Sequence, residues 1–300
     1  MNVVVLGQGI WGQTLARLVQ RNGHRAIALS CREPLPPQPA DVLISAVAVA
    51  GVPTAIERLR DWPTAIPLIT ATKGLDARTE KTPAQLWHGA FPDRPLAVLS
   101  GPNLATEINQ GLPAAAVVAS RDRSLAEQGQ TLLASRQFRV YTNDDPLGVE
   151  LGGTLKNAIA LAVGVCDGLG LGSNARAALV TRGMAEMVRI AVEFGARPET
   201  LWGLAGLGDL LATCTSPLSR NYQVGQRLAQ GLSLPAALAT VAGTAEGVNT
   251  VAVLQRWGQN RGISLPICEC TQRLLRGDIQ PQQAVAELME RELKPEQLPH

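Results

Sequence analysis

The chain has 300 residues, with 27 basic and 25 acidic side chains, 46% hydrophobic residues and only 3% aromatic residues. This length accommodates two domains, the apolar fraction excludes a disordered protein, and the even charge balance without runs of Lys or Arg makes nucleic acid a poor partner. Five scattered cysteines without a CxxC pair predict free thiols in a reducing cytoplasm and no metal site.

The first half of the chain alternates strand-like and helix-like segments. Residues 2–6 form a β-branched run that begins at once, without a basic region, so we expect a strand and no signal peptide. The longest apolar stretch contains Gly51 and Pro53 and is too short to span a bilayer, so no membrane span is expected. The alternation predicts an α/β fold with a Rossmann-type, doubly wound parallel sheet over residues 1–145. Further strands are predicted at residues 26–30, 41–47, 66–70, 96–99, 114–119 and 137–141.

The second half is predicted to be helical throughout. Asp145 is a good N-cap and Pro146 a good first helical residue, and no convincing strand follows them. We therefore expect an all-α C-terminal domain over residues 146–300. Its helices are predicted at residues 146–168, 173–194, 207–214, 220–229, 246–261, 265–276 and 281–291.

A GxGxxG motif, GQGIWG, lies between the first predicted strand and the first helix. Gly7 makes the tight turn, Gly9 lets the backbone approach a pyrophosphate, and Gly12 allows the helix to pack on the strand. This placement favours a dinucleotide site that also includes Ile10 and Trp11. A purely structural turn is the alternative.

The end of the second predicted strand bears on the choice of cofactor. An acid there accepts hydrogen bonds from the adenosine ribose of NAD, whereas an Arg accommodates the extra phosphate of NADP. This chain has Ser30 at the strand end and Arg32 shortly after it, which favours NADP. Glu33 leaves NAD open, so the predicted cofactor is NADP or NAD, with NADP favoured.

One lysine lies within a long apolar segment. Within residues 151–179 only Lys156, Asp167 and Arg176 carry charge. Burial lowers the pKa of an ammonium group because the charged form loses its water, so Lys156 is a candidate proton donor or acceptor near neutral pH. The alternatives are a structural lysine that reaches the surface and one that pairs with an acid such as Glu150.

Four other short segments place polar residues at strand ends or helix starts. They read TKG at residues 72–74, SGPN at 100–103, GLGD at 206–209 and SRN at 219–221. Each alone is explained by turn chemistry or helix capping. Together with the Lys-Asn pair at 156–157, they closely resemble the NAD(P)-dependent glycerol-3-phosphate dehydrogenases, especially the bacterial-type family that supplies glycerol phosphate for phospholipid synthesis. The resemblance covers nearly the whole chain.

The resemblance implies hydride transfer between NAD(P)H and the middle carbon of dihydroxyacetone phosphate. Lys156 would be the proton donor and acceptor, Lys73 a second cation and Asp209 the group that orients the substrate; Thr213, one helical turn later, would share the face of Asp209. The implied substrate contacts are Lys73, Gly101, Asn103, Lys156, Asn157, Asp209, Ser219, Arg220 and Asn221. The implied cofactor contacts are Gly7, Gly9, Ile10, Trp11, Gly12, Arg32, Lys73, Ala105, Arg220 and Glu246.

The chain departs from the family in three places. Between Arg32 and Asp41 it lacks room for a helix and a strand that usually follow the second strand. Ala48 and Val49 replace a proline-serine pair beside the nicotinamide ribose, and Asn103 stands where Ser or Thr is usual.

Two other functions stay open. A β-hydroxyacid or 6-phosphogluconate-type dehydrogenase shares a helical second domain but uses a Lys-x-x-Asn arrangement, whereas here Asn157 directly follows Lys156. A non-catalytic dinucleotide-binding regulator is conceivable because of the missing segment, although the lysines at 73 and 156 are intact. In every case we expect a small-molecule substrate or ligand. The sequence leaves the oligomeric state open, with a homodimer as one candidate.

Overall fold

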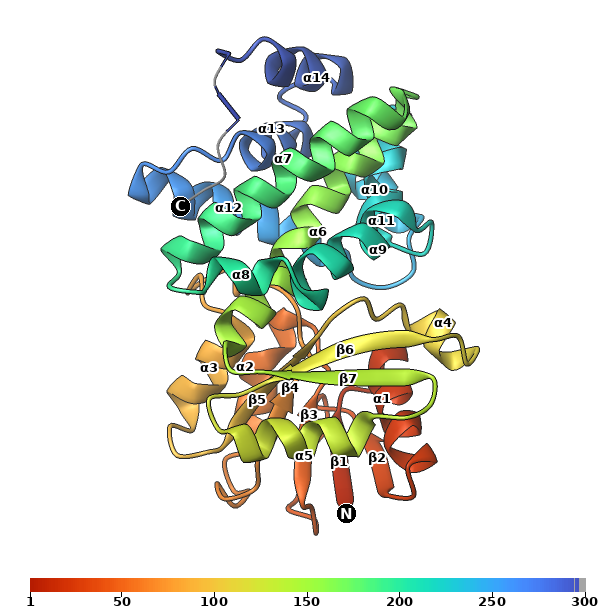
Figure 1. The fold of residues 1–300 in the computed structure, drawn as a ribbon, viewed down its shortest axis with the longest axis vertical. Coiled ribbons are helices and arrows are strands. Elements are labelled where there is room, and N and C mark those ends of the chain that lie inside the picture. The colour runs from red at the N-terminus through yellow and green to blue at the C-terminus, as the bar shows by residue number, and fades with distance from the viewer. Residues whose placement is uncertain (294, 297–300) are drawn as a thin grey trace.

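The computed structural model describes residues 1–293, 295 and 296. An N-terminal half that contains a sheet packs against a helical C-terminal half (Figure 1). Residues 294 and 297–300, which belong to our predicted C-terminal domain, lie outside the described residues. The predicted order, a Rossmann-type sheet followed by helices, is confirmed.

The sheet has seven strands in the order β2-β1-β3-β4-β5-β6-β7. The strands from β2 to β5 are parallel, and so are β6 and β7, but β5 and β6 are antiparallel, so the predicted parallel sheet is mostly parallel and reverses at this pair. The reason is that the link from β5 to β6 carries only a five-residue helix, α4, and does not cross back over the sheet. The strands are β1 Asn2–Leu6, β2 Arg25–Leu29, β3 Val42–Ser45, β4 Leu68–Thr70, β5 Leu96–Ser100, β6 Ala114–Ala119 and β7 Phe138–Asn143.

Alternate residues of β1 point to opposite faces of the sheet and enter two separate cores. Val3 and Val5 pack under α1 and α5, whereas Val4 and Leu6 pack with α2, α3 and Trp62. Both faces are therefore covered, as a doubly wound sheet requires. The helices of this half are α1 Ile10–Arg21, the short 3-10 helix η1 Val49–Gly51, α2 Val52–Arg58, α3 Pro83–Ala90, α4 Ala105–Asn109 and α5 Arg123–Leu133.

The short segment after β2 changes the edge of the sheet. β2 is the outermost strand on its side, and the chain returns directly to β3, which pairs with β1. The expected loss of a helix and a strand here is confirmed, because the Rossmann order places a further strand beyond this position.

The C-terminal half surrounds α6, whose range is the predicted one. The structure adds two short helices, α8 and α11, and a π-helix, η2, which are too short to produce a hydrophobic period in the sequence. The elements are α6 Pro146–Gly168, α7 Gly172–Glu193, α8 Pro198–Leu201, η2 Leu204–Gly208, α9 Asp209–Thr215, α10 Arg220–Ala229, α11 Leu234–Ala239, α12 Glu246–Arg261, α13 Pro266–Arg276 and α14 Pro281–Met289.

Glycines let α10 pack directly on the backbone of α6. A Cβ on Gly164 would lie 2.2 Å from the carbonyl oxygen of Tyr222, and one on Gly225 would lie 2.1 Å from that of Leu161. α6 is long and apolar enough to cross a membrane, but 94% of its most apolar window is buried, which is typical of a core helix. This close packing fixes the start of α10 beside the polar residues of α6.

Candidate active site

Asp209 joins two lysines that come from different halves of the molecule. Lys156, in the middle of α6, donates to its Oδ1, and Lys73, which follows β4, donates to its Oδ2 at 2.6 Å. Lys73 Nζ also donates to the carbonyl oxygen of Gly101 at 3.1 Å. Two ammonium groups thus share one carboxylate, in a cluster at the junction of the sheet and the helices.

The Lys156 side chain is buried, and its ion-pair partner is Asp209 and not Glu150. Glu150 accepts a hydrogen bond from the Ala84 amide, so pairing of Lys156 with Glu150 is wrong, and Asp209 takes that place. Burial lowers the pKa of Lys156 to about 8; the Asp209 carboxylate opposes this shift and the Lys73 ammonium adds to it. Lys156 also donates to the Thr213 hydroxyl at 2.6 Å, as the predicted shared face implied.

Small residues let Lys73 reach this cluster. A Cβ on Gly153 of α6 would lie 2.2 Å from Ser100 Oγ and 3.2 Å from Lys73 Cε, so the lysine passes across the bare backbone of the helix. Gly101 has φ +134°, and a Cβ there would lie 3.0 Å from the carbonyl oxygen of Ala115. Glycine is needed at both positions because any side chain would displace the Lys73 side chain or the β5 to α4 turn.

Two polar side chains beside the cluster have unused hydrogen-bonding capacity. Both amide atoms of Asn103 and the hydroxyl of Ser100 are shielded from solvent, and none has a partner among the described residues. A buried polar atom without a partner is costly, so these groups are suited to bind a polar ligand. Asn103 lies near the cluster because α4 keeps the link between β5 and β6 at this edge of the sheet.

Asn157 and Asn221 are engaged with each other. Asn221 Nδ2 donates to Asn157 Oδ1 at 2.9 Å, and Asn221 Oδ1 accepts from the Gly247 amide at 2.9 Å. The pair therefore ties α6 to α10 and to the first turn of α12. Both amides are thus engaged inside the protein, and Asn157 Nδ2 also donates to the Gly153 carbonyl at 3.4 Å.

The start of α10 carries a guanidinium next to the first backbone amides of the helix. Ser219 is the N-cap of this ten-residue helix and accepts from the Tyr222 amide at 3.3 Å, while Arg220 follows as the first helical residue. A Cβ on Gly243 would lie 2.9 Å from Arg220 Nη1. Glu246 lies close by: burial raises its pKa, while the Val49 amide and the Arg220 guanidinium lower it.

The glycine turn fits a dinucleotide. Gly7 has φ +118°, and a Cβ on Gly12 would lie 2.0 Å from the Gly7 carbonyl oxygen. Gly9 is the N-cap of α1 without a side-chain cap, and a Cβ there would meet nothing within 4 Å. The start of this twelve-residue helix is thus exposed and has room beside Gly9, which suits a pyrophosphate. Ile10 is 68% exposed and Trp11 is half-buried on the same turn.

A chain of contacts links this turn to the lysines along the carboxyl ends of the parallel strands. A Cβ on Gly7 would lie 2.7 Å from the Ala46 carbonyl oxygen, and Thr72 Oγ1 donates to the Val47 carbonyl at 2.9 Å. Lys73 follows directly. Arg32, three residues after the end of β2, is exposed and its side chain forms no ion pair with a described residue. Ala105 is the first residue of α4.

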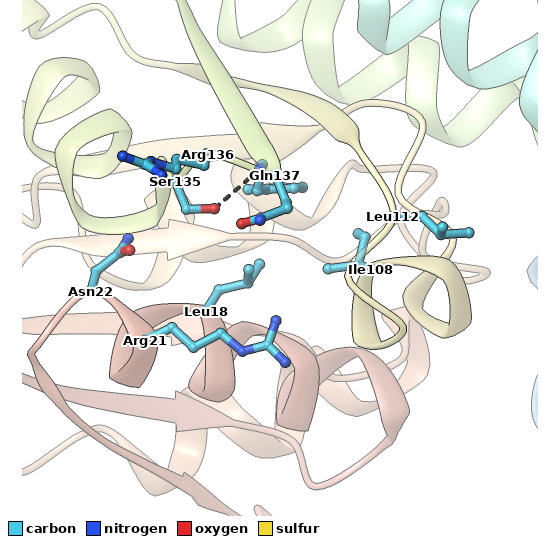
Figure 2. Close-up of a pocket in the computed structure, with 9 residues that line it drawn as sticks. Leu18, Arg21, Asn22, Ile108, Leu112, Ser135, Arg136 and Gln137 are labelled. Carbon is cyan, nitrogen blue, oxygen red and sulfur yellow. Dashed lines mark hydrogen bonds between the residues drawn. The ribbon is translucent and has the colours of Figure 1, made fainter.

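Two cavities lie outside the lysine cluster. One, of about 240 Å³, is lined by residues from the far end of α1, from α4 and from the turn before β7, as Figure 2 shows for Arg21, Ile108 and Gln137. A second, of about 400 Å³, reaches Pro102 and Ala212 at the border of the lysine cluster. Neither includes the two lysines, because these are packed between the two halves. Within the described residues, no three His, Cys, Asp or Glu side chains are placed to hold a metal ion.

Comparison with known proteins identifies the family. A model of the NAD-dependent glycerol-3-phosphate dehydrogenase C-terminus matches residues 145–286, and one of the N-terminus matches residues 37–126. The glycerol-3-phosphate dehydrogenase (NAD(P)+) of Synechocystis sp. is 56% identical to this chain, over 98% of the chain and 95% of the relative. The chain belongs to the NAD-dependent glycerol-3-phosphate dehydrogenase family. The resemblance drawn from its motifs is confirmed.

Other relatives agree. The glycerol-3-phosphate dehydrogenase (NAD(P)+) of Synechococcus sp. strain JA-3-3Ab is 57% identical, over 98% of this chain and 97% of the relative. The crystal structure of glycerol-3-phosphate dehydrogenase from Coxiella burnetii superposes with a TM-score of 0.91 at 34% identity, over 97% of this chain and 99% of that one. A ketopantoate reductase from Ralstonia eutropha, with a TM-score of 0.59 at 14% identity, shares the fold alone.

Sequence reasoning missed several residues that hold the site of this glycerol-3-phosphate dehydrogenase family member together. Thr154 accepts from the Gly74 amide at 3.0 Å, and Asn249 donates to the Leu75 carbonyl at 2.7 Å. Their partners are backbone groups 80 and 174 residues away along the chain. No local pattern marks such a residue, since its partner is chosen by the tertiary fold.

Proposed function

We propose that this chain, as an NAD(P)-dependent glycerol-3-phosphate dehydrogenase, interconverts sn-glycerol 3-phosphate and dihydroxyacetone phosphate. The observation that carries the proposal is the buried Lys156 ammonium, held by Asp209 between the edge of the sheet and the start of α10. When bound, the dinucleotide supplies or accepts the hydride at the middle carbon of the substrate. The family membership and the fit of the glycine turn support NAD or NADP as that group.

In the proposed reduction, Lys156 holds a proton at the carbonyl oxygen of the middle carbon. Negative charge grows on this oxygen as the carbon is reduced, and the ammonium stabilises it and then donates its proton. In the reverse direction, neutral Lys156 accepts the hydroxyl proton. Asp209 fixes the direction of the Lys156 ammonium, and Lys73 adds a second positive charge on the same side.

The phosphate of the substrate would bind at the start of α10. Arg220 supplies a guanidinium, and the first amides of the helix and the Ser219 hydroxyl lie beside it. We assign the other polar contacts of the substrate to the Gly101 to Asn103 turn, where the amide of Asn103 has both atoms unpaired. Asn157 and Asn221 would support this arrangement mainly by holding α6 and α10 together.

For the cofactor, we propose contacts with the glycine turn, Trp11, Ala105, Arg220 and Glu246, and a preference for NADP through the exposed Arg32. Turnover with NADH and with NADPH, measured side by side in the native protein and in Arg32→Ser, tests the preference. The native protein should favour NADPH and the variant should lose that preference. An equal ratio of NADPH turnover to NADH turnover in the two proteins would contradict a role for Arg32.

We infer a cytoplasmic enzyme that makes glycerol phosphate for phospholipid synthesis, and five unpaired, buried cysteines support a reducing compartment. A homodimer is the candidate assembly, which light scattering on the purified protein decides.

The direct test of the activity is loss of NADPH fluorescence when dihydroxyacetone phosphate is added to the purified protein. We expect turnover with this substrate and none with 3-hydroxy acids or 6-phosphogluconate and NADP+. Turnover with the latter compounds alone would favour the other dehydrogenase class, and cofactor binding without any turnover would favour a regulator.

A further inference from the structure

The loop that follows Lys73, residues 74–81, belongs to the sheet half by sequence but to the helical half by packing. Leu75 is fully buried and lies in the apolar core formed by α6, α7, α10, α12 and α13. No other residue before α6 belongs to that core among those the structure describes. The loop is therefore a peg from the N-terminal half, inserted into the helices directly after the lysine.

Hydrogen bonds from two helices hold this peg. Asn249 of α12 donates to the Leu75 carbonyl at 2.7 Å, and Arg256, two turns later on the same helix, donates to the Ala77 carbonyl at 2.8 Å. On the other side, Thr154 of α6 accepts from the Gly74 amide at 3.0 Å. The contacts of Thr154 and Asn249 fall one and two residues after Lys73, respectively, where they fix the direction of its backbone.

The peg is also rigid within itself. The Asp76 carboxylate is buried and accepts from the Thr79 amide at 2.9 Å and from the Thr79 hydroxyl at 2.8 Å. The Asp76 amide donates to the Lys81 carbonyl at 2.9 Å. These bonds keep residues 76–81 in one arrangement, and the Thr154 contact holds Gly74 between the buried Leu75 and Lys73, so the seating of the loop bears on the direction of the lysine.

We propose that Asn249 is a positioning residue for Lys73: by holding the Leu75 carbonyl, it sets the loop so that the Lys73 ammonium meets Oδ2 of Asp209. Among the described residues, Asn249 forms no hydrogen bond with the Asp209 carboxylate or with either lysine. Its effect therefore passes through the peg. This inference rests on the proposed functions of Lys73 and Lys156.

The arrangement predicts a signature at Lys156. The charged and titratable groups that face Lys156 are Asp209 and Cys214 from α9 and Lys73, which directly precedes the peg. If the Lys73 ammonium moves away from Asp209, Lys156 loses a like charge and keeps the carboxylate to itself. Both changes raise the pKa of Lys156 above its native value of about 8. In the reduction, which needs protonated Lys156, the alkaline limb of the rate profile then moves to higher pH.

The experiment compares the full-length variants Asn249→Leu and Asn249→Ala with Asn260→Ala, which removes an exposed amide from the last turn of the same helix. Leu keeps the shape of Asn without its N–H, so both Asn249 variants lose the bond while only one loses bulk. We expect kcat for dihydroxyacetone phosphate reduction to fall about 10- to 100-fold in both variants. We also expect the alkaline limb of the rate profile to move to higher pH by about 0.5 unit or more. Asn260→Ala should match the native protein in kcat and in the limb.

Cofactor binding, followed by NADPH fluorescence, and thermal unfolding show that each variant is folded. A native kcat in the Asn249 variants, or a fall in kcat with an unmoved alkaline limb, overturns the proposal, since the second result is what a merely structural contact gives. Lys156→Ala is measured alongside. Native turnover in Lys156→Ala would instead remove the proposed function on which the inference rests, so the two failures are distinguishable.

Discussion

Lys73 and Lys156 donate to different oxygens of one carboxylate, that of Asp209, although one lysine follows a strand of the sheet and the other lies in the middle of α6. With both lysines protonated, one carboxylate leaves a net positive charge in a site largely shielded from water. The low local dielectric strengthens the attraction between this positive charge and an anion. The site therefore favours an anionic substrate and the oxyanion that develops during the reaction.

Replacing Lys156 with Ala should abolish most of the turnover. The variant loses the group that we assign to proton transfer, and positioned acid-base groups contribute about 10²- to 10⁴-fold to rate. We expect kcat to fall by about this factor while the dissociation constant for NADPH stays nearly native, since the glycine turn is unchanged. Stopped-flow turnover and fluorescence titration measure the two quantities. Lys81→Ala, which removes an exposed lysine, is the control, and turnover within a few-fold of native in Lys156→Ala would refute the assignment.

The rate of reduction should fall at alkaline pH as Lys156 loses its proton. Burial lowers the pKa of this lysine to about 8, and the Asp209 carboxylate keeps it from falling further. In Asp209→Asn the carboxylate charge is gone and the pKa of Lys156 drops, so less of the acid is protonated at a given pH. The alkaline limb of kcat/KM should therefore move to lower pH. A limb that moves upward, or not at all, is incompatible with this pairing.

Arg220→Ala should weaken substrate binding. The variant removes the guanidinium that we place at the substrate phosphate, and a hydrogen bond to a charged group of this kind corresponds to about 10- to 100-fold in affinity. We expect KM for dihydroxyacetone phosphate to rise by about this factor. Arg227→Ala, an exposed arginine on the last turn of the same helix, should leave KM unchanged. Equal KM values in the two variants would place the phosphate elsewhere.

Asp145→Ala should destabilise the junction between the two halves. The Asp145 carboxylate accepts from the Gly148 amide at 3.0 Å, the Arg197 amide at 3.0 Å and the Thr200 hydroxyl at 2.8 Å, so it caps α6 and α8 together. Loss of a cap and of partners for buried donors should lower the free energy of unfolding by about 2–4 kcal/mol. Urea unfolding measures this, with the exposed neighbour variant Asp144→Ala as a control that should unfold near the native midpoint. Coincident midpoints for the two variants would contradict the double cap.

Local patterns were sufficient for much of the fold. The β-branched run at Asn2–Leu6, the glycine turn after it and the Asp-Pro start of α6 each specify an element through neighbouring residues, and each appears where it was predicted. The motifs around Lys73, Lys156, Asp209 and Arg220 also sufficed for the family, because such combinations at strand ends and helix starts are rarely needed for folding alone.

The sequence by itself therefore determined the order of strands and helices, the position of the glycine turn and the residue types available for chemistry, since these depend on contacts over a few residues. Only the tertiary structure decided that β6 runs against β5, that Asp209 rather than Glu150 is the partner of Lys156, and that Leu75 and Asn249 seat the Lys73 loop among the helices. These pairings join groups up to 174 residues apart, and they are selected by how two packed halves fit together, which no local stretch of sequence encodes.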